Sequence, residues 1–327
     1  MNKKETDSEF SLIEKITSGF QDFHGLKKGI GDDAAVIPME GGKYQLISAD
    51  TLVENDHFNF AWSSPLQVGM KAVEVNVSDI AAMGGTPTFI LVSIVLNSKT
   101  PTKNLEEVYC GIQVKCEKYG ISLIGGDTTH GESFVISVTI LGEVSRDNLL
   151  LRSGAKAGDL LCVTGKLGAS SAGYFSLKKG VSVKDLSSSI KKKHLTPESR
   201  LEAARLISPY ASSMIDISDG LASEAKHLAV SSQTGVVVNQ NQIPVSEEVL
   251  LIEKQLGFNP YFFALSGGED FELLFSIGPE NMKKIEKNFR DFTVVGEMTD
   301  KVGSFLLLQE NKKTIPLPRG WDHLLDF

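Results

Sequence analysis

Residues 64–85 read SPLQVGMKAVEVNVSDIAAMGG, and we infer the fold outward from the helix that this stretch predicts. Ser64 suits the N-cap of a helix, and Pro65 suits the first helical position because that position needs no backbone N–H. Gly84-Gly85 ends the helix, since glycine readily takes the left-handed conformation of a helix terminus. A strand-like, β-branched run follows at 89–96. The stretch therefore predicts a long helix leading into a strand.

Short strand and helix patterns alternate along the rest of the chain, which is typical of α+β domains. Strands are expected at 34–38, 44–48, 121–124, 134–144, 160–164, 236–238, 271–277, 293–295 and 305–308. Helices are expected at 9–20, 105–119, 198–207, 221–230, 249–256 and 281–289.

The length and one loop-like stretch predict two domains. The chain has 327 residues, which is more than one typical domain needs. The small residues at 153–158 separate two sets of strand and helix patterns. We therefore predict an N-terminal domain at 1–148 and a C-terminal domain at 149–327. The Lys- and Ser-rich residues 180–195 are expected to form an exposed loop.

The charge balance argues against a nucleic-acid partner. The net charge is −8, whereas nucleic-acid binding needs a basic face. The nearest candidate, Lys191-Lys192-Lys193, is more typical of a solvated helix face or loop. The longest apolar run, 89–96, is too short to span a bilayer, and the N-terminus lacks the apolar core of a secretory signal. These features predict a soluble, cytoplasmic protein without a membrane partner.

The three cysteines, Cys110, Cys116 and Cys162, do not predict a zinc site or a disulfide scaffold. They lack C-x-x-C spacing, and their number is odd. Cys110 and Cys116 fall in a helical pattern, where cysteine behaves as a small hydrophobic residue.

Six short segments place acidic residues beside small or polar ones. Glycine lets a backbone approach a phosphate closely, and aspartate supplies the hard oxygen ligands that Mg²⁺ prefers. Several carboxylates repel one another in a partly buried site unless divalent cations neutralise them. This set therefore predicts metal-assisted phosphoryl transfer. The segments are 31–33 (GDD), 48–50 (SAD), 76–79 (NVSD), 125–127 (GGD), 216–220 (DISDG) and 268–270 (GED).

Some of these patterns allow two interpretations. Asp79 lies in a helical, mostly apolar segment beside Asn76, so it is either a metal ligand or part of a solvated helix face. The stretch 165–173 (GKLGASSAG) is either a phosphate cradle or a loop with a helix start. The sequence contains no G-x-x-x-x-G-K-[ST] and no H-R-D or D-F-G set. These absences exclude a P-loop nucleotide hydrolase and a protein kinase.

Read in chain order, the acidic segments and their neighbours resemble the thiamine-monophosphate kinase family. The resemblance runs from residue 30 to 323, nearly the whole chain. The matching stretches are 30–35 (IGDDAA), 50–53 (DTLV) with His57-Phe58, 75–85 (VNVSDIAAMGG), 125–129 (GGDTT), 216–221 (DISDGL), 266–274 (SGGEDFELL) and 320–323 (GWDH).

The resemblance implies a fold and an activity. The fold is the two-domain architecture shared with aminoimidazole ribonucleotide synthetase and selenophosphate synthetase. Mixed-sheet N-terminal domains pair there into the barrel of a homodimer, and a C-terminal domain of a sheet plus helices closes the nucleotide and substrate site. The implied reaction moves the γ-phosphoryl of ATP onto thiamine phosphate with the help of several Mg²⁺ ions.

The resemblance also implies roles for individual residues, transferred by position. The residues implied to hold Mg²⁺ are Asp33, Ser48, Asp50, Asp79, Asp127, Asp216 and Asp219, of which Asp50, Asp79, Asp127 and Asp219 would be catalytic. The residues implied to contact ATP are Tyr109, Gly126, Asp127, Arg152 and Ser218. The residues implied to contact thiamine phosphate are His57, Glu269 and Trp321.

The chain departs from the family pattern at Ala49, where the family often has a second hydroxyl residue before the aspartate. A side-chain ligand is lost there, although the backbone carbonyl can still coordinate. The relatives fit less well. A selenophosphate synthetase would need a reactive cysteine near its N-terminus, but the first cysteine here is Cys110. The hydrogenase-maturation protein ends in a cysteine, whereas this chain ends in Phe327.

Three functions remain open from the sequence. The first is thiamine-phosphate kinase. The second is an ATP-dependent enzyme of the same fold that activates an amide or carbonyl oxygen and releases inorganic phosphate. The third is a metal- or nucleotide-binding module without turnover. For the first, a phosphate monoester has a second pKa of about 6, so the nucleophile is already ionised and needs no general base. Trp321 would either stack on the cationic substrate or pack on the core.

Overall fold

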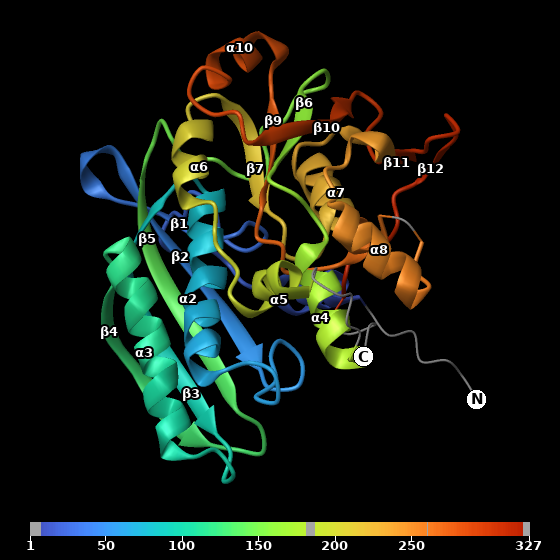
Figure 1. Cartoon of the computed structure of the whole chain (residues 1–327). Coiled ribbons are helices and arrows are strands. Elements are labelled where there is room, and N and C mark those ends of the chain that lie inside the picture. The colour runs from blue at the N-terminus through green and yellow to red at the C-terminus, as the bar shows by residue number, and fades with distance from the viewer. Residues whose placement is uncertain (1–7, 181–186, 260, 323–327) are drawn as a thin grey trace.

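The computed structural model describes residues 8–180, 187–259 and 261–322, which build two sheets with helices packed against them (Figure 1). His323, the last residue of the expected GWDH stretch, lies outside the described residues. The five-stranded N-terminal sheet has the order β1-β2-β5-β3-β4 and is antiparallel except for the β3–β4 pair. Its strands are β1 (Ala35–Pro38), β2 (Lys43–Val53), β3 (Thr86–Leu96), β4 (Ser122–His130) and β5 (Val135–Ser145).

Two long helices, α2 (Pro65–Ala82) and α3 (Thr102–Tyr119), lie side by side across one face of this sheet (Figure 1). The expected helix start is confirmed, because Ser64 and Gln67 form a capping box ahead of Pro65. The two helices approach closely through glycine. A Cβ added at Gly69 would lie 1.9 Å from the carbonyl oxygen of Val108, so only glycine permits this packing. The short helix α1 (Glu9–Thr17) precedes the sheet.

The C-terminal sheet has seven strands in the order β12-β11-β8-β10-β6-β9-β7. All its neighbours are antiparallel except β8 and β11. The strands are β6 (Leu160–Thr164), β7 (Ala211–Asp216), β8 (Gly235–Asn239), β9 (Leu273–Ile277), β10 (Phe292–Thr299), β11 (Phe305–Leu308) and β12 (Thr314–Pro316). The helices are α4 (Ala169–Lys179), α5 (Ser187–Leu195), α6 (Leu201–Ile207), α7 (Leu221–Ser231), α8 (Glu247–Leu256), α9 (Phe262–Ser266) and α10 (Met282–Ile285).

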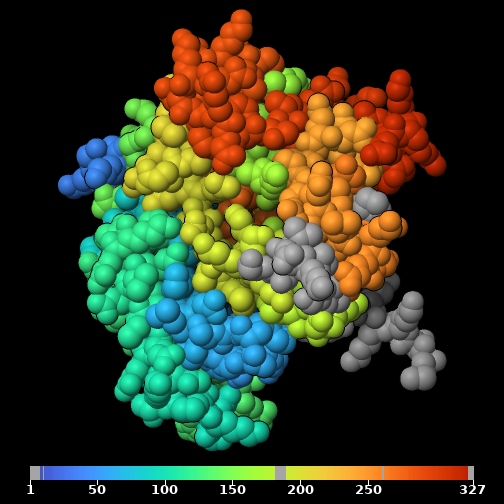
Figure 2. Space-filling view, viewed as in Figure 1, coloured from blue at the N-terminus to red at the C-terminus, as the bar shows by residue number. Residues whose placement is uncertain are grey.

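The two domains share a hydrophobic core. Buried residues of the first domain, such as Ile80 and Val138, belong to the same cluster as Met214 and Phe275 of the second. Helix α6 packs on α2, and Figure 2 shows this region, in yellow, seated directly against the N-terminal domain. The expected pair of α+β domains, one with a mixed sheet and one with a sheet plus helices, is confirmed. Within the described ranges, no helix has the length and apolarity needed to cross a membrane.

Several local expectations were wrong. Residues 181–186 of the loop expected at 180–195 lie outside the described residues. The part at Ser187–Leu195 is helix α5, because Ile190 and His194, one helical turn apart, are buried together. The strand expected at 121–124 runs on to His130, so the acidic segment 125–127 is part of β4. The helix expected at 281–289 is reduced to the single α-helical turn of α10, and the helix expected at 198–207 begins only at Leu201.

Candidate active site

Four carboxylates from both domains form a cluster where the two sheets meet. Asp33 precedes β1, Asp50 lies on β2, Asp79 on α2 and Asp216 at the end of β7. Burial raises the pKa of Asp79 well above its ordinary value, and the charges of Asp50 and Asp216 raise it further. Burial, with the charge of Asp33, raises the pKa of Asp216 to about 8. The four groups are therefore close enough to oppose one another's ionisation.

Neighbouring hydroxyl and guanidinium groups partly compensate the negative charge of this cluster. The hydroxyl of Ser48 donates to Asp79, and the hydroxyl of Ser78 donates to Asp216 at 2.6 Å. The guanidinium of Arg152 binds the Oδ1 atom of Asp33 through Nε at 3.0 Å and Nη2 at 2.5 Å. The other oxygen of Asp33 is buried and accepts no hydrogen bond. A buried carboxylate oxygen without a donor is costly, so the cluster has capacity for a further positive ligand.

The donor set fits a hard divalent cation such as Mg²⁺, which binds carboxylate and hydroxyl oxygens. Bound cations would lower the raised pKa values that the clustered carboxylates now have. Among the described residues, no three acidic, histidine or cysteine side chains already converge on one metal position.

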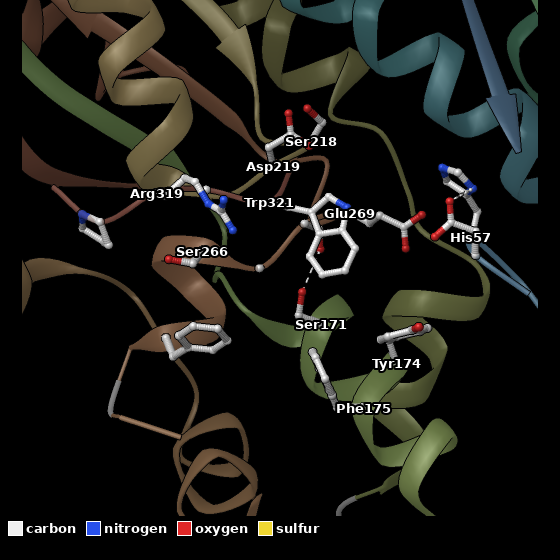
Figure 3. Close-up of a pocket in the computed structure, with 16 residues that line it drawn as sticks. His57, Ser171, Tyr174, Phe175, Ser218, Asp219, Ser266, Glu269, Arg319 and Trp321 are labelled. Atoms are coloured by element: carbon white, nitrogen blue, oxygen red, sulfur yellow. Dashed lines mark hydrogen bonds and ion pairs between the residues drawn. The ribbon is translucent and has the colours of Figure 1, made fainter. Parts of the chain in front are cut away.

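A cavity of about 370 Å³ is lined in part by Ser218 and Asp219, which follow the cluster residue Asp216 along the chain (Figure 3). His57 lines it from the N-terminal domain, and Ser218, Asp219, Glu269 and Trp321 line it from the C-terminal domain. In Figure 3 the Trp321 indole lies between Ser218 and Asp219 on one side and helix α4 on the other. Aromatic lining comes from α4 and α9, with Tyr174, Phe175 and Phe262, and charged lining also comes from Asp56 and Arg319. The cavity thus joins an apolar, aromatic end to an acidic one.

Backbone hydrogen bonds hold the polar residues of the cavity in place. The N–H of Glu269 donates to the carbonyl of Ser218 at 2.7 Å, and the N–H of Trp321 donates to the carbonyl of Asp219 at 2.9 Å. The N–H of Asp219 donates to the Glu224 carboxylate at 2.8 Å. Burial, followed by the charge of Asp219, raises the pKa of Glu224 well above its ordinary value. Glu224 therefore extends the acidic cluster, although no motif pointed to it.

The glycine-rich stretch 165–173 is a helix start. The Asp270 carboxylate accepts hydrogen bonds from the N–H groups of Gly168 at 2.6 Å and Ser170 at 3.3 Å, at the N-terminus of α4. An aspartate therefore occupies the position that a phosphate would need. Of the two interpretations left open by the sequence, the structure favours the loop and helix start.

Three expected site residues lie apart from the cluster within one chain. Tyr109, Gly126 and Asp127 line a separate, open depression on β4 and α3. Strands β2 and β4 are separated by β5 and β3, so Asp50 and Asp127 are three strand spacings apart, roughly 14 Å.

The two aspartates also face opposite sides of the sheet. Asp127 pairs with Ser93, which is exposed between buried neighbours. Asp50 pairs with buried Val138 on the face covered by helices. Gly126 is required where it stands, because an added Cβ would lie 1.8 Å from the carbonyl oxygen of Val92.

The expected residues thus fall into three groups. The first is the buried cluster of Asp33, Ser48, Asp50, Asp79, Arg152 and Asp216. The second surrounds the cavity and contains His57, Ser218, Asp219, Glu269 and Trp321. The third is Tyr109, Gly126 and Asp127 on the exposed edge.

Sequence reasoning missed Lys71, His194 and the aromatic wall of the cavity. Lys71 and His194 lie in segments interpreted only as helix and loop. Their partners are distant in the sequence, so no local pattern marked them.

Comparison with known proteins agrees with this architecture. Residues 31–144 match the family model of the AIR synthase related protein N-terminal domain, and residues 156–308 match that of its C-terminal domain. The fold and the site therefore define a two-domain protein related to AIR synthase.

Full-length relatives narrow this class. The chain is 38% identical to the thiamine-monophosphate kinase of Buchnera aphidicola subsp. Acyrthosiphon pisum over 97% of this chain and 98% of that protein. It is 34% identical to the Bacillus subtilis thiamine-monophosphate kinase, with 96% and 99% covered. The structure of AaThiL complexed with AMPPCP and TMP superimposes with a TM-score of 0.86 at 33% identity, covering 99% of both chains. The chain belongs to the thiamine-monophosphate kinase family.

Proposed function

We propose that this protein phosphorylates thiamine monophosphate to thiamine diphosphate at the expense of ATP. A phosphate oxygen of thiamine monophosphate attacks the γ-phosphorus in line, the bond from that phosphorus to the bridging oxygen breaks, and ADP leaves. The observation that carries the proposal is the position of the aromatic cavity, which adjoins a buried carboxylate cluster through Ser218 and Asp219. Such a cavity suits a cationic heteroaromatic molecule whose phosphate points toward the cluster.

We assign the residues of the cluster to Mg²⁺ and those of the cavity to the acceptor substrate. Bound Mg²⁺ would neutralise both phosphates and hold them in line. Arg152 would add a fixed positive charge near the nucleotide, and Trp321 would cover the substrate ring. The proposed metal ligands are Asp33, Ser48, Asp50, Asp79, Asp127, Asp216 and Asp219, the ATP contacts are Tyr109, Gly126, Asp127, Arg152 and Ser218, and the thiamine phosphate contacts are His57, Glu269 and Trp321.

The acceptor requires no general base from the protein. A phosphate monoester is largely dianionic at neutral pH, because its second pKa is about 6. The task of the chain is therefore to bind and orient two polyanions and to exclude water between them. Asp50, Asp79 and Asp219 serve this task as ligands of the cation and not as proton acceptors.

We infer a homodimer in which β4 is covered by a second copy. All nine residues of β4 are exposed, and no other strand of the described residues pairs with its outer edge. Large apolar side chains are also exposed there, including Phe89, Leu123 and Ile124. An uncovered apolar edge strand invites pairing with another chain.

Two further expectations stay proposals. We place the domain boundary between residues 148 and 149, in the segment between the two sheets. We place the enzyme in the cytoplasm, where ATP is available to a biosynthetic kinase.

Mass spectrometry of the products tests the proposed reaction. The purified protein is mixed with ATP, Mg²⁺ and thiamine phosphate. Thiamine diphosphate and ADP in equal amounts, both abolished by Asp50→Ala, are expected. ADP with free phosphate and no thiamine diphosphate would favour an enzyme that activates a carbonyl or amide oxygen. Absence of nucleotide turnover would favour a binding module.

A further inference from the structure

A buried lysine links the two domains directly beneath the cavity. Lys71 lies on α2 and is 2% exposed. Its Nζ atom donates to the carbonyl oxygen of His57 at 2.8 Å, and it lies 2.7 and 2.8 Å from the two carboxylate oxygens of Glu269. One ammonium group therefore holds the backbone of one cavity residue and the side chain of another. These two residues come from different domains.

Glu269 is held from several sides. Its backbone is left-handed, with φ at 65°, a conformation that non-glycine residues adopt rarely. Its carboxylate also lies 3.0 Å from the Nδ1 atom of His194 on α5. Burial lowers the pKa of His194, so the neutral ring donates from Nδ1 to the carboxylate. The Glu269 side chain is still 23% exposed, on the side that faces the cavity (Figure 3).

The charge of Glu269 is fixed by the same contacts. Burial alone would raise its pKa, but Lys71 and His194 together hold the pKa well below its usual range. Glu269 is therefore an ionised acceptor that cannot donate. An anionic acceptor repels a phosphate and attracts an N–H donor of a ring. The neighbouring wall of Tyr174 and Phe175 is where such a ring would lie.

We propose that Lys71 and His194 are positioning residues that fix Glu269 as the hydrogen-bond acceptor for the amino-bearing ring of the acceptor substrate. This inference rests on the proposed function, because thiamine phosphate carries an aminopyrimidine at the end opposite its phosphate. Lys71 acts through Glu269 and does not touch the substrate itself. It sets the affinity for the acceptor substrate without affecting the affinity for ATP.

The chain contains a matched control for a purely structural role. Lys115 on α3 forms a similarly buried ion pair with Glu74 on α2, at 2.5 Å. Lys115 and Glu74 do not line the cavity. Loss of either lysine removes one buried ion pair to α2, but only the Lys71 pair orients a group that faces the substrate.

Steady-state kinetics of Lys71→Met, His194→Gln and Lys115→Met test the inference, with both substrates varied in turn. Lys71→Met should raise the KM for thiamine phosphate about 10-fold or more, as expected for the loss of one charge-assisted hydrogen bond. The KM for ATP should stay within about two-fold of wild type, and His194→Gln should act in the same direction. Lys115→Met should lower the thermal midpoint without changing either KM.

An analogue with a carbonyl oxygen in place of the pyrimidine amino group provides a second readout. Wild type should prefer thiamine phosphate over this analogue, and Lys71→Met should lose most of that preference. If Lys71→Met leaves an unpaired charge and does not fold, His194→Gln decides, because it keeps the Lys71–Glu269 ion pair and should still raise the KM for thiamine phosphate.

Equal effects of Lys71→Met on the two KM values, or an unchanged preference between the two acceptors, would overturn the inference. Failure of the proposed function is recognised separately, because wild type would then form no thiamine diphosphate. In that case the affinity of each variant for thiamine phosphate, measured by calorimetric titration, tests the positioning role of Lys71. Weaker binding by Lys71→Met than by Lys115→Met supports the positioning role, and equal binding by the two variants refutes it.

Discussion

The carboxyl group of Asp270 allows a quantitative test of the electrostatics beneath the cavity. It is 7% exposed at the N-terminus of α4, and burial raises its pKa from 3.8 to about 7 despite the N–H groups of Gly168 and Ser170. A raised carboxyl pKa means that the folded state binds the proton more tightly than the unfolded state. The contribution of Asp270 to stability is therefore greatest below about pH 4 and declines as the pH rises to about 7.

We expect Asp270→Asn to remove this decline, since the amide keeps an oxygen acceptor for the helix terminus and does not titrate. While the folded state is protonated and the unfolded state ionised, each pH unit costs about 1.4 kcal/mol. Between about pH 5 and about pH 7.5 wild type should lose about 2–3 kcal/mol of unfolding free energy that the variant keeps. Urea unfolding of both proteins at the two pH values measures this difference.

An exposed aspartate supplies the control for this experiment. Asp300 is exposed in the bend after β10, so Asp300→Asn controls for the loss of a surface aspartate and should change the unfolding free energy only slightly. If the difference between wild type and Asp270→Asn does not change with pH, Asp270 does not titrate in this range. The reasoning from burial would then be refuted.

Three further changes test the cluster, the cavity and the exposed edge. Asp79→Asn should abolish thiamine diphosphate formation. It should also raise the thermal midpoint in Mg²⁺-free buffer with chelator, because the amide removes the free-energy cost of a buried carboxyl whose pKa is raised by burial and by the charges of Asp50 and Asp216; a lower midpoint by calorimetry would contradict this. Trp321→Ala should raise the KM for thiamine phosphate about 2- to 30-fold, as the loss of a cation–π contact predicts, and should leave the KM for ATP unchanged. An unchanged KM for thiamine phosphate in the kinetic assay would mean that the indole only packs against the protein. Leu123→Lys should shift the protein from dimer to monomer in analytical ultracentrifugation. A monomeric wild type would refute the proposal that a second copy covers β4.

The elements that the sequence predicted well are those whose limits are set by neighbouring residues. The start of α2 follows from Ser64, Pro65 and Gln67, which lie within four positions of one another. The acidic segments were also found early, because aspartate beside glycine marks a phosphate or metal site through residue type alone. Neither inference needed knowledge of tertiary contacts.

The expectations that were wrong depended on distant partners. The strand expected at 121–124 was predicted to stop before Gly125-Gly126, yet β4 continues through them, and Gly126 is needed there because an added Cβ would clash with the Val92 carbonyl on β3. Lys71 looked like an ordinary helical lysine, although its partner Glu269 is 198 residues away. Tertiary approach overrides local propensity at such positions, and a single sequence carries no direct signal of it.

The distribution of charge across the two domains ties cation binding to their arrangement. Asp50 and Asp79 belong to the N-terminal domain and Asp216 to the C-terminal domain, so their repulsion opposes the contact between domains when no cation is bound. The Lys71–Glu269 pair acts in the opposite direction and holds the domains together across the same region. A divalent ion that binds the cluster would stabilise the contact between the two domains. The stabilisation would equal the difference between its binding free energy for domains in contact and for domains apart. Binding of the proposed cation would therefore be coupled to assembly of the proposed acceptor cavity, because both would depend on the position of α2 relative to the loops that carry Asp216 and Glu269.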